Sequence, residues 1–237
     1  MKFIISIDDD RFARFMQRAI EAFGEDPGFT RINLTPDDVT VPDWWEAAPD
    51  RWAVTQAIRV ALVTALENGE DCELFEDDCV FCENFTQRRT DFLSKLPDDW
   101  DMAYLGGQLL ATELYPPMLI DDKIVLAKNV HRNHAWICRH RSIQRLVDWL
   151  DEPQWSNSHT SDWRIGYLQL KPDFHTYIPK EGWLCGQGEN HSLLDSRDYP
   201  DRWWHYTEPE FSNERKLWDE FSQTKKEADT QDMALYI

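Results

Sequence analysis

The stretch Cys72-Glu73-Leu74-Phe75-Glu76-Asp77-Asp78 decides the expected fold, because a short apolar strand ends there in three consecutive acids. A helix-like run that ends at Asn68-Gly69 comes directly before it. Side chains alternate between the two faces of a strand, so we expect Glu76 and Asp78 to project together and Asp77 to the opposite side until the strand gives way to a loop.

Clustered carboxylates repel one another unless a cation or a proton compensates their charge. Mg²⁺ and Mn²⁺ prefer oxygen ligands, and the carboxyl end of a strand in an α/β sheet is where such folds bind ligands. The acidic stretch therefore favours a divalent-cation site that would also neutralise bound phosphates. A solvated turn is the alternative interpretation of three acids before a loop.

The rest of the chain alternates between strand and helix patterns. Apolar runs predict strands at 3–7, 31–34, 102–105, 134–138 and 174–178, and spaced apolar residues predict helices at 11–23, 51–68, 143–150 and from Ser161 to before Pro172. This order predicts an α/β layered fold with a largely parallel sheet. Gly106-Gly107 follows one predicted strand, where it would form either a ligand-facing backbone segment or a tight turn.

Composition limits the possible classes of protein. The chain has 237 residues with 25 basic and 44 acidic side chains, and its formal charge of −19 makes duplex nucleic acid an unlikely partner. We expect one domain over 1–205 and a charged helix or tail over 206–237. The N-terminal apolar run is too short for a signal peptide, and no segment is long enough to span a membrane, so a cytoplasmic location is expected. Cys79-x-x-Cys82 lacks the second such pair that a structural zinc site needs.

Several segments in order resemble one known family. They are Asp10-Arg11 after the first strand, LFEDDCVF at 74–81, DWDMAYLGG at 99–107, HAWICRHRSIQRLV at 134–147 and SDWRIGYL at 161–168. The chain resembles the family 25 glycosyltransferases, which include bacterial lipopolysaccharide galactosyltransferases and collagen galactosyltransferases. The resemblance covers about residues 1–190. It implies a GT-A fold (a Rossmann-like three-layer sandwich), a nucleotide-sugar donor such as a UDP-sugar, a Mn²⁺ or Mg²⁺ ion, a hydroxyl acceptor on a glycan or other biomolecule, and inversion at the anomeric carbon.

The resemblance also implies roles for single residues. Asp78 would coordinate the metal, and Glu76 or Asp77 would contact the nucleotide ribose or metal-bound water. Asp162 would be the catalytic base, although an acid at a helix N-terminus is equally expected from the helix dipole. Arg11 would lie near the nucleotide.

A late histidine often completes the metal site in GT-A enzymes, which makes His191 a hypothesised ligand. The glycines Gly106 and Gly107 are candidates for the nucleotide site. The chain departs from the family pattern at Thr55-Gln56, where relatives often carry Ser-His, and at Ser6-Ile7, where they carry Asn-Leu.

Two other classes of protein remain open on the residues alone. A metal-dependent phosphohydrolase or nuclease would also use clustered acids, but it should carry more acidic and histidine motifs and a more basic cleft. A non-catalytic carbohydrate-binding protein descended from a transferase would use exposed tryptophans, and the chain contains 12 tryptophans.

Overall fold

A computed structural model describes residues 1–112, 114–153 and 160–188, together with the backbone of 190–191 and 198–199. Its helices are α1 (Asp9–Phe23), α2 (Pro49–Glu67), α3 (Phe85–Leu93), α4 (His140–Asp151) and α5 (Ser161–Gln169), with a short 3-10 helix at Pro36–Asp38. Its strands are β1 (Lys2–Ile5), β2 (Thr30–Ile32), β3 (Cys72–Glu76), β4 (Cys79–Phe81), β5 (Met102–Leu109), β6 (Met118–Leu119), β7 (Ile124–Ala127), β8 (Val130–Cys138), β9 (Thr176–Pro179), β10 (Cys185–Gln187), β11 (Asn190–His191) and β12 (Asp198–Tyr199). The expected tail at 206–237 lies outside the described residues.

A mixed sheet of eight strands forms the centre, in the order β2-β1-β3-β8-β5-β9-β7-β6. β1 pairs in parallel with β2 and β3, and β5 pairs in parallel with β9. β8 runs antiparallel to both β3 and β5, and β7 is antiparallel to β9 and β6. Within this sheet, every strand except β8 and β7 therefore points in the same direction. The prediction of a largely parallel sheet is confirmed.

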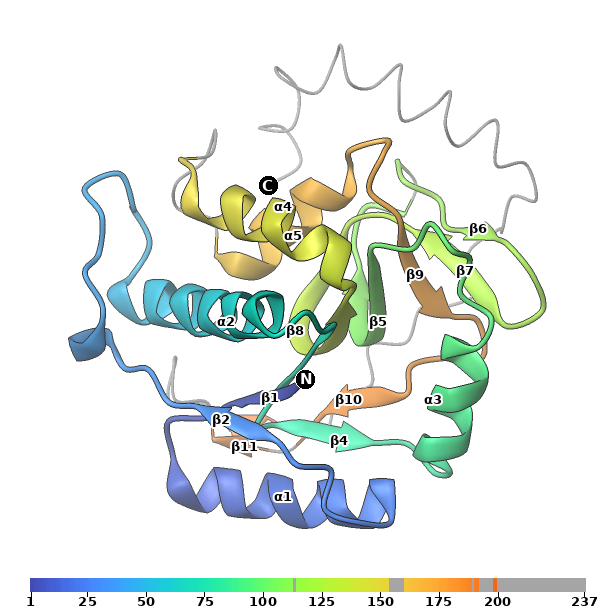
Figure 1. Ribbon diagram of the computed structural model, residues 1–237, viewed down its shortest axis with the longest axis horizontal. Coiled ribbons are helices and arrows are strands. Elements are labelled where there is room, and N and C mark those ends of the chain that lie inside the picture. Colours follow the sequence, from blue (N-terminus) through green and yellow to red (C-terminus); the bar gives the residue numbers. More distant parts are fainter. Residues whose placement is uncertain (113, 154–159, 189, 192–197, 200–237) are drawn as a thin grey trace.

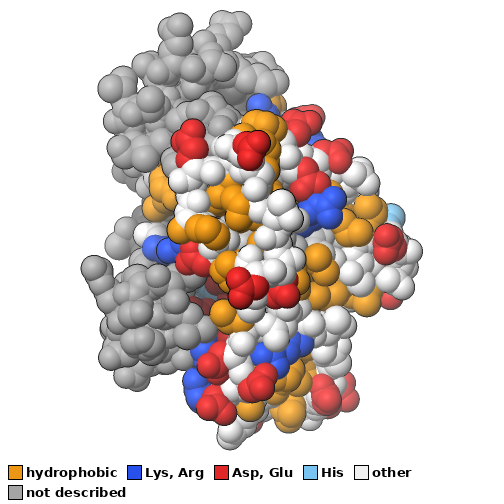
Figure 2. Space-filling model, turned by 90° about the vertical axis from the view of Figure 1, so that its left-hand side faces the viewer, with side chains coloured by type: hydrophobic (Ala, Val, Ile, Leu, Met, Phe, Trp, Pro, Cys, Tyr) orange, Lys and Arg blue, Asp and Glu red, His pale blue; other side chains and the backbone are white. Residues whose placement is uncertain are grey.

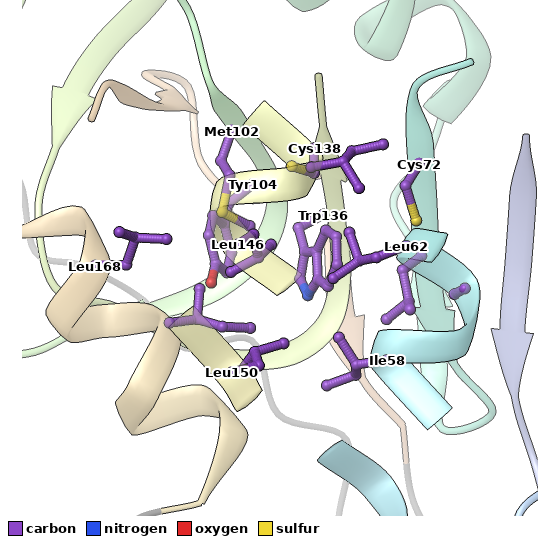
Figure 3. Packing of buried hydrophobic residues seen from close by; sticks show 14 of the residues in the cluster. Ile58, Leu62, Cys72, Met102, Tyr104, Trp136, Cys138, Leu146, Leu150 and Leu168 are labelled. Atoms are coloured by element: carbon purple, nitrogen blue, oxygen red, sulfur yellow. The ribbon is translucent and has the colours of Figure 1, made fainter. Parts of the chain in front are cut away.

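Helices cover both faces of the sheet, which gives three layers (Figure 1). On one face α2, α4 and α5 pack against Phe3, Leu74, Tyr104 and Trp136, and Figure 3 shows Tyr104 and Trp136 surrounded by aliphatic side chains of these helices. On the other face α1 and α3 pack against the residues that alternate with these along the strands, such as Ile4 and Phe75. The period-two alternation of each strand thus supplies two separate cores.

The two long N-terminal helices begin and end close to the predicted positions. Asp8 caps α1 by accepting a hydrogen bond from the backbone N–H of Arg11 at 2.8 Å, and Gly24 ends the helix with a φ of 80°. That left-handed conformation is one that glycine adopts without strain. α2 buries Ala57, Ile58, Ala61, Leu62 and Ala65 along one side.

The expectation of a turn at Gly106-Gly107 is wrong, because both glycines lie inside β5. A Cβ atom at Gly106 would lie 2.4 Å from the carbonyl oxygen of Cys185 and 2.5 Å from Nε2 of His134. At Gly107 it would lie 2.8 Å from Cγ1 of Val130. Close packing of protein atoms accounts for both glycines, and it lets β10 lie directly against the central sheet.

Several elements were not predicted: β4, α3, β6, β7 and β10. The segment from Glu70 to Asp101, which contains α3, is strongly acidic. Phe85 and Phe92 nevertheless anchor α3 in the second core, with exposed fractions of 1% and 3%.

Among the residues that the structure describes, none of the helices combines the length and apolar character needed to cross a bilayer.

Shortening the buried Leu62 side chain should destabilise the fold, whereas the same kind of change on the exposed side of α2 should not. Leu62 is fully buried, so Leu62→Ala should lower the free energy of unfolding by about 2–5 kcal/mol, as large-to-small core changes do. Val60, on the same helix, is 37% exposed, and Val60→Ala should change the free energy of unfolding by less than about 0.5 kcal/mol. Urea unfolding followed by circular dichroism measures both, and equal effects would contradict the assignment of α2's buried side.

Candidate functional site

The end of β3 places three acids on two sides of the sheet. The strand ends at Glu76, and Asp77 and Asp78 form the turn that leads to β4. Glu76 follows the alternation of Leu74 toward the side of α5, while Asp77 follows Phe75 toward the side of α1. The expected separation of Asp77 from its neighbour is therefore confirmed, and each acid meets different partners.

Asp77 is held by two side chains on the α1 side. Its Oδ1 accepts a hydrogen bond from Nε of Arg11 at 2.8 Å, with Nη2 of Arg11 also in contact, and its Oδ2 accepts one from the hydroxyl of Ser6 at 2.7 Å. Burial raises the pKa of Asp77, although Arg11 and Ser6 both act to lower it. Arg11 thus lies beside the acidic turn, and its predicted place near a nucleotide stays a prediction. Whether Asp77 also touches a ribose or metal-bound water stays a prediction.

Asp78 is positioned by the segment that follows β10. Its Oδ2 accepts a hydrogen bond from Nε2 of Gln187 at 2.7 Å, and its backbone carbonyl accepts one from the N–H of Gly188 at 2.5 Å. β10 pairs with β4 in an antiparallel ladder that places Gln187 opposite Cys79, the residue after Asp78. β10 and the glycine that follows it therefore hold the acidic turn in place. Sequence reasoning missed Gln187, because nothing local in the sequence links it to residue 78.

Glu76 has a strongly perturbed pKa. Burial raises its pKa well above the usual value, and the negative charges of Asp78, Asp162 and Asp77 raise it further. The guanidinium of Arg132 acts in the opposite direction. A carboxyl group in this setting holds its proton more strongly than a free glutamate, unless additional positive charge arrives.

Asp162 comes from a distant part of the chain to the same place. It lies in the first turn of α5, where its Oδ1 accepts hydrogen bonds from the hydroxyl of Thr160 and, at 3.1 Å, from the backbone N–H of Trp163. Asp162 is thus an acid in the favourable dipole of a helix N-terminus, and its charge also acts on Glu76. Its role as catalytic base stays a prediction.

Arg132 is the basic residue that sequence analysis did not select. It lies in β8, half-buried, with a φ of 76° that costs a non-glycine residue roughly 1–2 kcal/mol. Its Nε donates a hydrogen bond to Oε1 of Gln108 at 3.2 Å, close to a register shift between β5 and β8. The sequence around it reads as an ordinary strand, so no local signal marks this backbone.

The residues can contribute to a metal site without enclosing one. In the part of the chain that the structure describes, no group of three His, Cys, Asp or Glu side chains is arranged to hold a metal ion. Mg²⁺-type ions are commonly held by one or two carboxylates together with substrate phosphates, so Asp78 is the residue that could contribute to such a site. That it binds a metal stays a prediction. His191 lies in β11, but its side chain is outside the described residues, and its role as a ligand stays a prediction.

Charge on one face of the molecule is mixed. Figure 2 shows Lys and Arg side chains interspersed with Asp and Glu side chains, without a broad basic area among its coloured atoms.

Comparison with known proteins does not assign this chain to a family: no family model matches it, and no curated protein matches it.

Removal of Arg11 should destabilise the protein more than removal of an exposed arginine. The side chains of Arg11 and Asp77 are only 12% and 8% exposed, so Arg11→Ala leaves a buried carboxylate without its cation and should cost about 3 kcal/mol. Arg59 pairs with Asp151 where both side chains are more than a third exposed, and Arg59→Ala should cost less than about 1 kcal/mol. Urea unfolding of the two variants compares them, and an Arg11 effect no larger than that of Arg59 would show that the buried pair does not stabilise the turn.

The raised pKa of Glu76 predicts a pH-dependent stability. The folded protein keeps the proton of Glu76 at pH values where the unfolded chain has released it, so stability falls as the pH rises above the usual value of 4.5 toward the folded-state pKa. Glu76→Gln removes this contribution, and its stability relative to the wild type should increase between about pH 5 and about pH 8. Urea unfolding at the two pH values tests this. The core variant Leu62→Ala is the control, since its deficit should be similar at both. A Glu76→Gln difference that does not change with pH would refute the prediction.

Proposed function

We propose that this protein is a metal-dependent glycosyltransferase that moves a sugar from a nucleotide-sugar donor to a hydroxyl acceptor. One observation carries the proposal: the charges of Asp78 and Asp162 both act on Glu76 at the carboxyl end of a parallel strand, where burial makes the negative charge of Glu76 costly. A site of this kind favours a cationic ligand, and the carboxyl edge of an α/β sheet is the usual place for a nucleotide.

Each side chain has a distinct part in the proposed reaction. Asp78, held by Gln187 and Gly188, would be the direct ligand of Mn²⁺ or Mg²⁺. Glu76 would lose its proton when positive charge enters the site. Arg11, fixed by Asp77, would lie along the nucleotide. The bound cation would supply Lewis-acid stabilisation of the charge that grows on the leaving diphosphate.

Asp162 would accept the proton of the acceptor hydroxyl. As that oxygen forms its bond to the anomeric carbon, the bond from that carbon to the diphosphate oxygen breaks, and the configuration inverts. A carboxylate can act in this way if it is within hydrogen-bond reach of the hydroxyl. The hydrogen bonds that Thr160 and Trp163 donate to Oδ1 of Asp162 orient its carboxyl group.

The GT-A form of the Rossmann-like fold is part of the same proposal. Two features support it: the acidic turn follows directly after the third parallel strand of β2-β1-β3, and α5 brings Asp162 to that turn. The assignment of a UDP-type donor and a glycan acceptor depends on the resemblance to family 25 glycosyltransferases, because none of the described residues is specific for either substrate.

Binding of UDP with and without Mn²⁺ tests the proposal. Calorimetry should show that Mn²⁺ tightens UDP binding by about tenfold or more, because the cation joins the carboxylate to the diphosphate. Asp78→Asn should abolish the dependence on metal. Asp148→Asn, on the exposed side of α4, is the matched control and should bind as the wild type does.

Two results would contradict the proposal. The wild-type protein could fail to bind UDP at millimolar concentration with Mn²⁺ present, which would instead favour a carbohydrate-binding protein or a phosphohydrolase. Alternatively, Asp78→Asn could retain the full effect of Mn²⁺, which would remove Asp78 from the metal site.

A further inference from the structure

Arg132 lies at the same edge of the sheet as the acidic turn. β3 and β8 are antiparallel, with Phe75 opposite Ala135, so continuation of this register places Arg132 just beyond the end of β3, level with Asp78. The effect of Arg132 on the pKa of Glu76 agrees with this position. Its half-buried side chain keeps part of its surface accessible to solvent.

The backbone of Arg132 is strained, because its φ lies in the left-handed region. A φ of 76° within a strand favours glycine, and the chain places arginine there. Strained conformations of this kind gather at ligand sites, where the side chain that they aim contributes to function. The hydrogen bond from Arg132 to Gln108 fixes the direction of the guanidinium.

The two arginines near the acids have different surroundings. Arg11 is joined to Asp77 on the α1 side of the sheet. Arg132 instead acts on Glu76, whose side of the strand also receives Asp162. A guanidinium carries several donors in one plane and binds phosphate oxygens in pairs, so it suits an anion that lies between it and a metal ion.

We infer that Arg132 binds the diphosphate of the nucleotide donor, opposite the cation held by Asp78, and stabilises that diphosphate as it leaves. This inference rests on the proposed function, and it adds a specific anion-binding residue to it. A diphosphate there would be held from two sides, by the metal ion and by the fork of the arginine.

Glycine and lysine at position 132 separate a binding role from a structural one. Arg132→Gly removes the guanidinium but relieves the backbone strain, so its urea midpoint should not fall. Its affinity for UDP and for inorganic pyrophosphate, each measured by calorimetry with saturating Mn²⁺, should fall by about ten- to hundredfold, as expected for loss of a charged hydrogen-bonding group. Arg132→Lys keeps the charge without the fork and should lose less. Ala111→Gly, at another residue with positive φ (52°), controls for the backbone change and should leave binding unaltered.

The inference is overturned if Arg132→Gly binds Mn²⁺–UDP within about twofold of the wild type. It is also overturned if the variant binds more weakly and its urea midpoint falls as well, because a damaged fold would then explain the loss of binding. In the first case the proposed function survives, because the wild type still shows metal-dependent UDP binding. A wild-type protein that binds neither UDP nor pyrophosphate with Mn²⁺ overturns the proposed function, and this inference with it.

Discussion

Mutual repulsion between the carboxylates gathered at the end of β3 is the interaction on which the site depends. Burial already disfavours the negative charges of Glu76 and Asp77, and Glu76 also lies within the influence of Asp78, Asp162 and Asp77. The protein offsets this cost differently for each acid. The carboxylate of Asp77 accepts hydrogen bonds from Arg11 and Ser6, whereas the carboxylate of Asp78 accepts one from Gln187. Glu76 is left with a strongly raised pKa, so the local charge balance favours a proton or a bound cation there.

The architecture of the sheet creates this arrangement. The alternation of β3 sends Glu76 and Asp77 to opposite layers, so one acid meets α5 and the other meets α1. Because β8 runs antiparallel beside β3, its first half extends past the end of β3 and brings Arg132 to the acidic turn. The small β4-β10 ladder then closes the turn from the other side through Gln187. Residues far apart in the chain thereby contribute to one site.

Sequence patterns were sufficient for the layered α/β class, for α1 and α2, and for the opposed directions of Glu76 and Asp77, because each depends on local periodicity. They were insufficient where distant contacts decide the structure. Gly106 looked like part of a turn, but the approach of Cys185 and His134 makes it part of a strand. Phe85 and Phe92 drive the formation of α3 within an acidic segment whose charges obscured it. No local sequence pattern marks Gln187 or Arg132 as part of the site. The β4-β10 ladder positions Gln187, and Arg132 lies next to a register shift between β5 and β8.

The central place of β8 also determines the order in which the chain can fold during synthesis. β1, β2 and β3 form one parallel group, and β5 and β9 form another, but within the sheet only β8 joins the two. A nascent chain that has emerged from the ribosome only as far as β5 cannot yet connect the first group to the second. The exposed edge of β3 must wait for residues 135–138 before it is paired. Until those residues have been synthesised, that edge is unpaired and open to wrong partners.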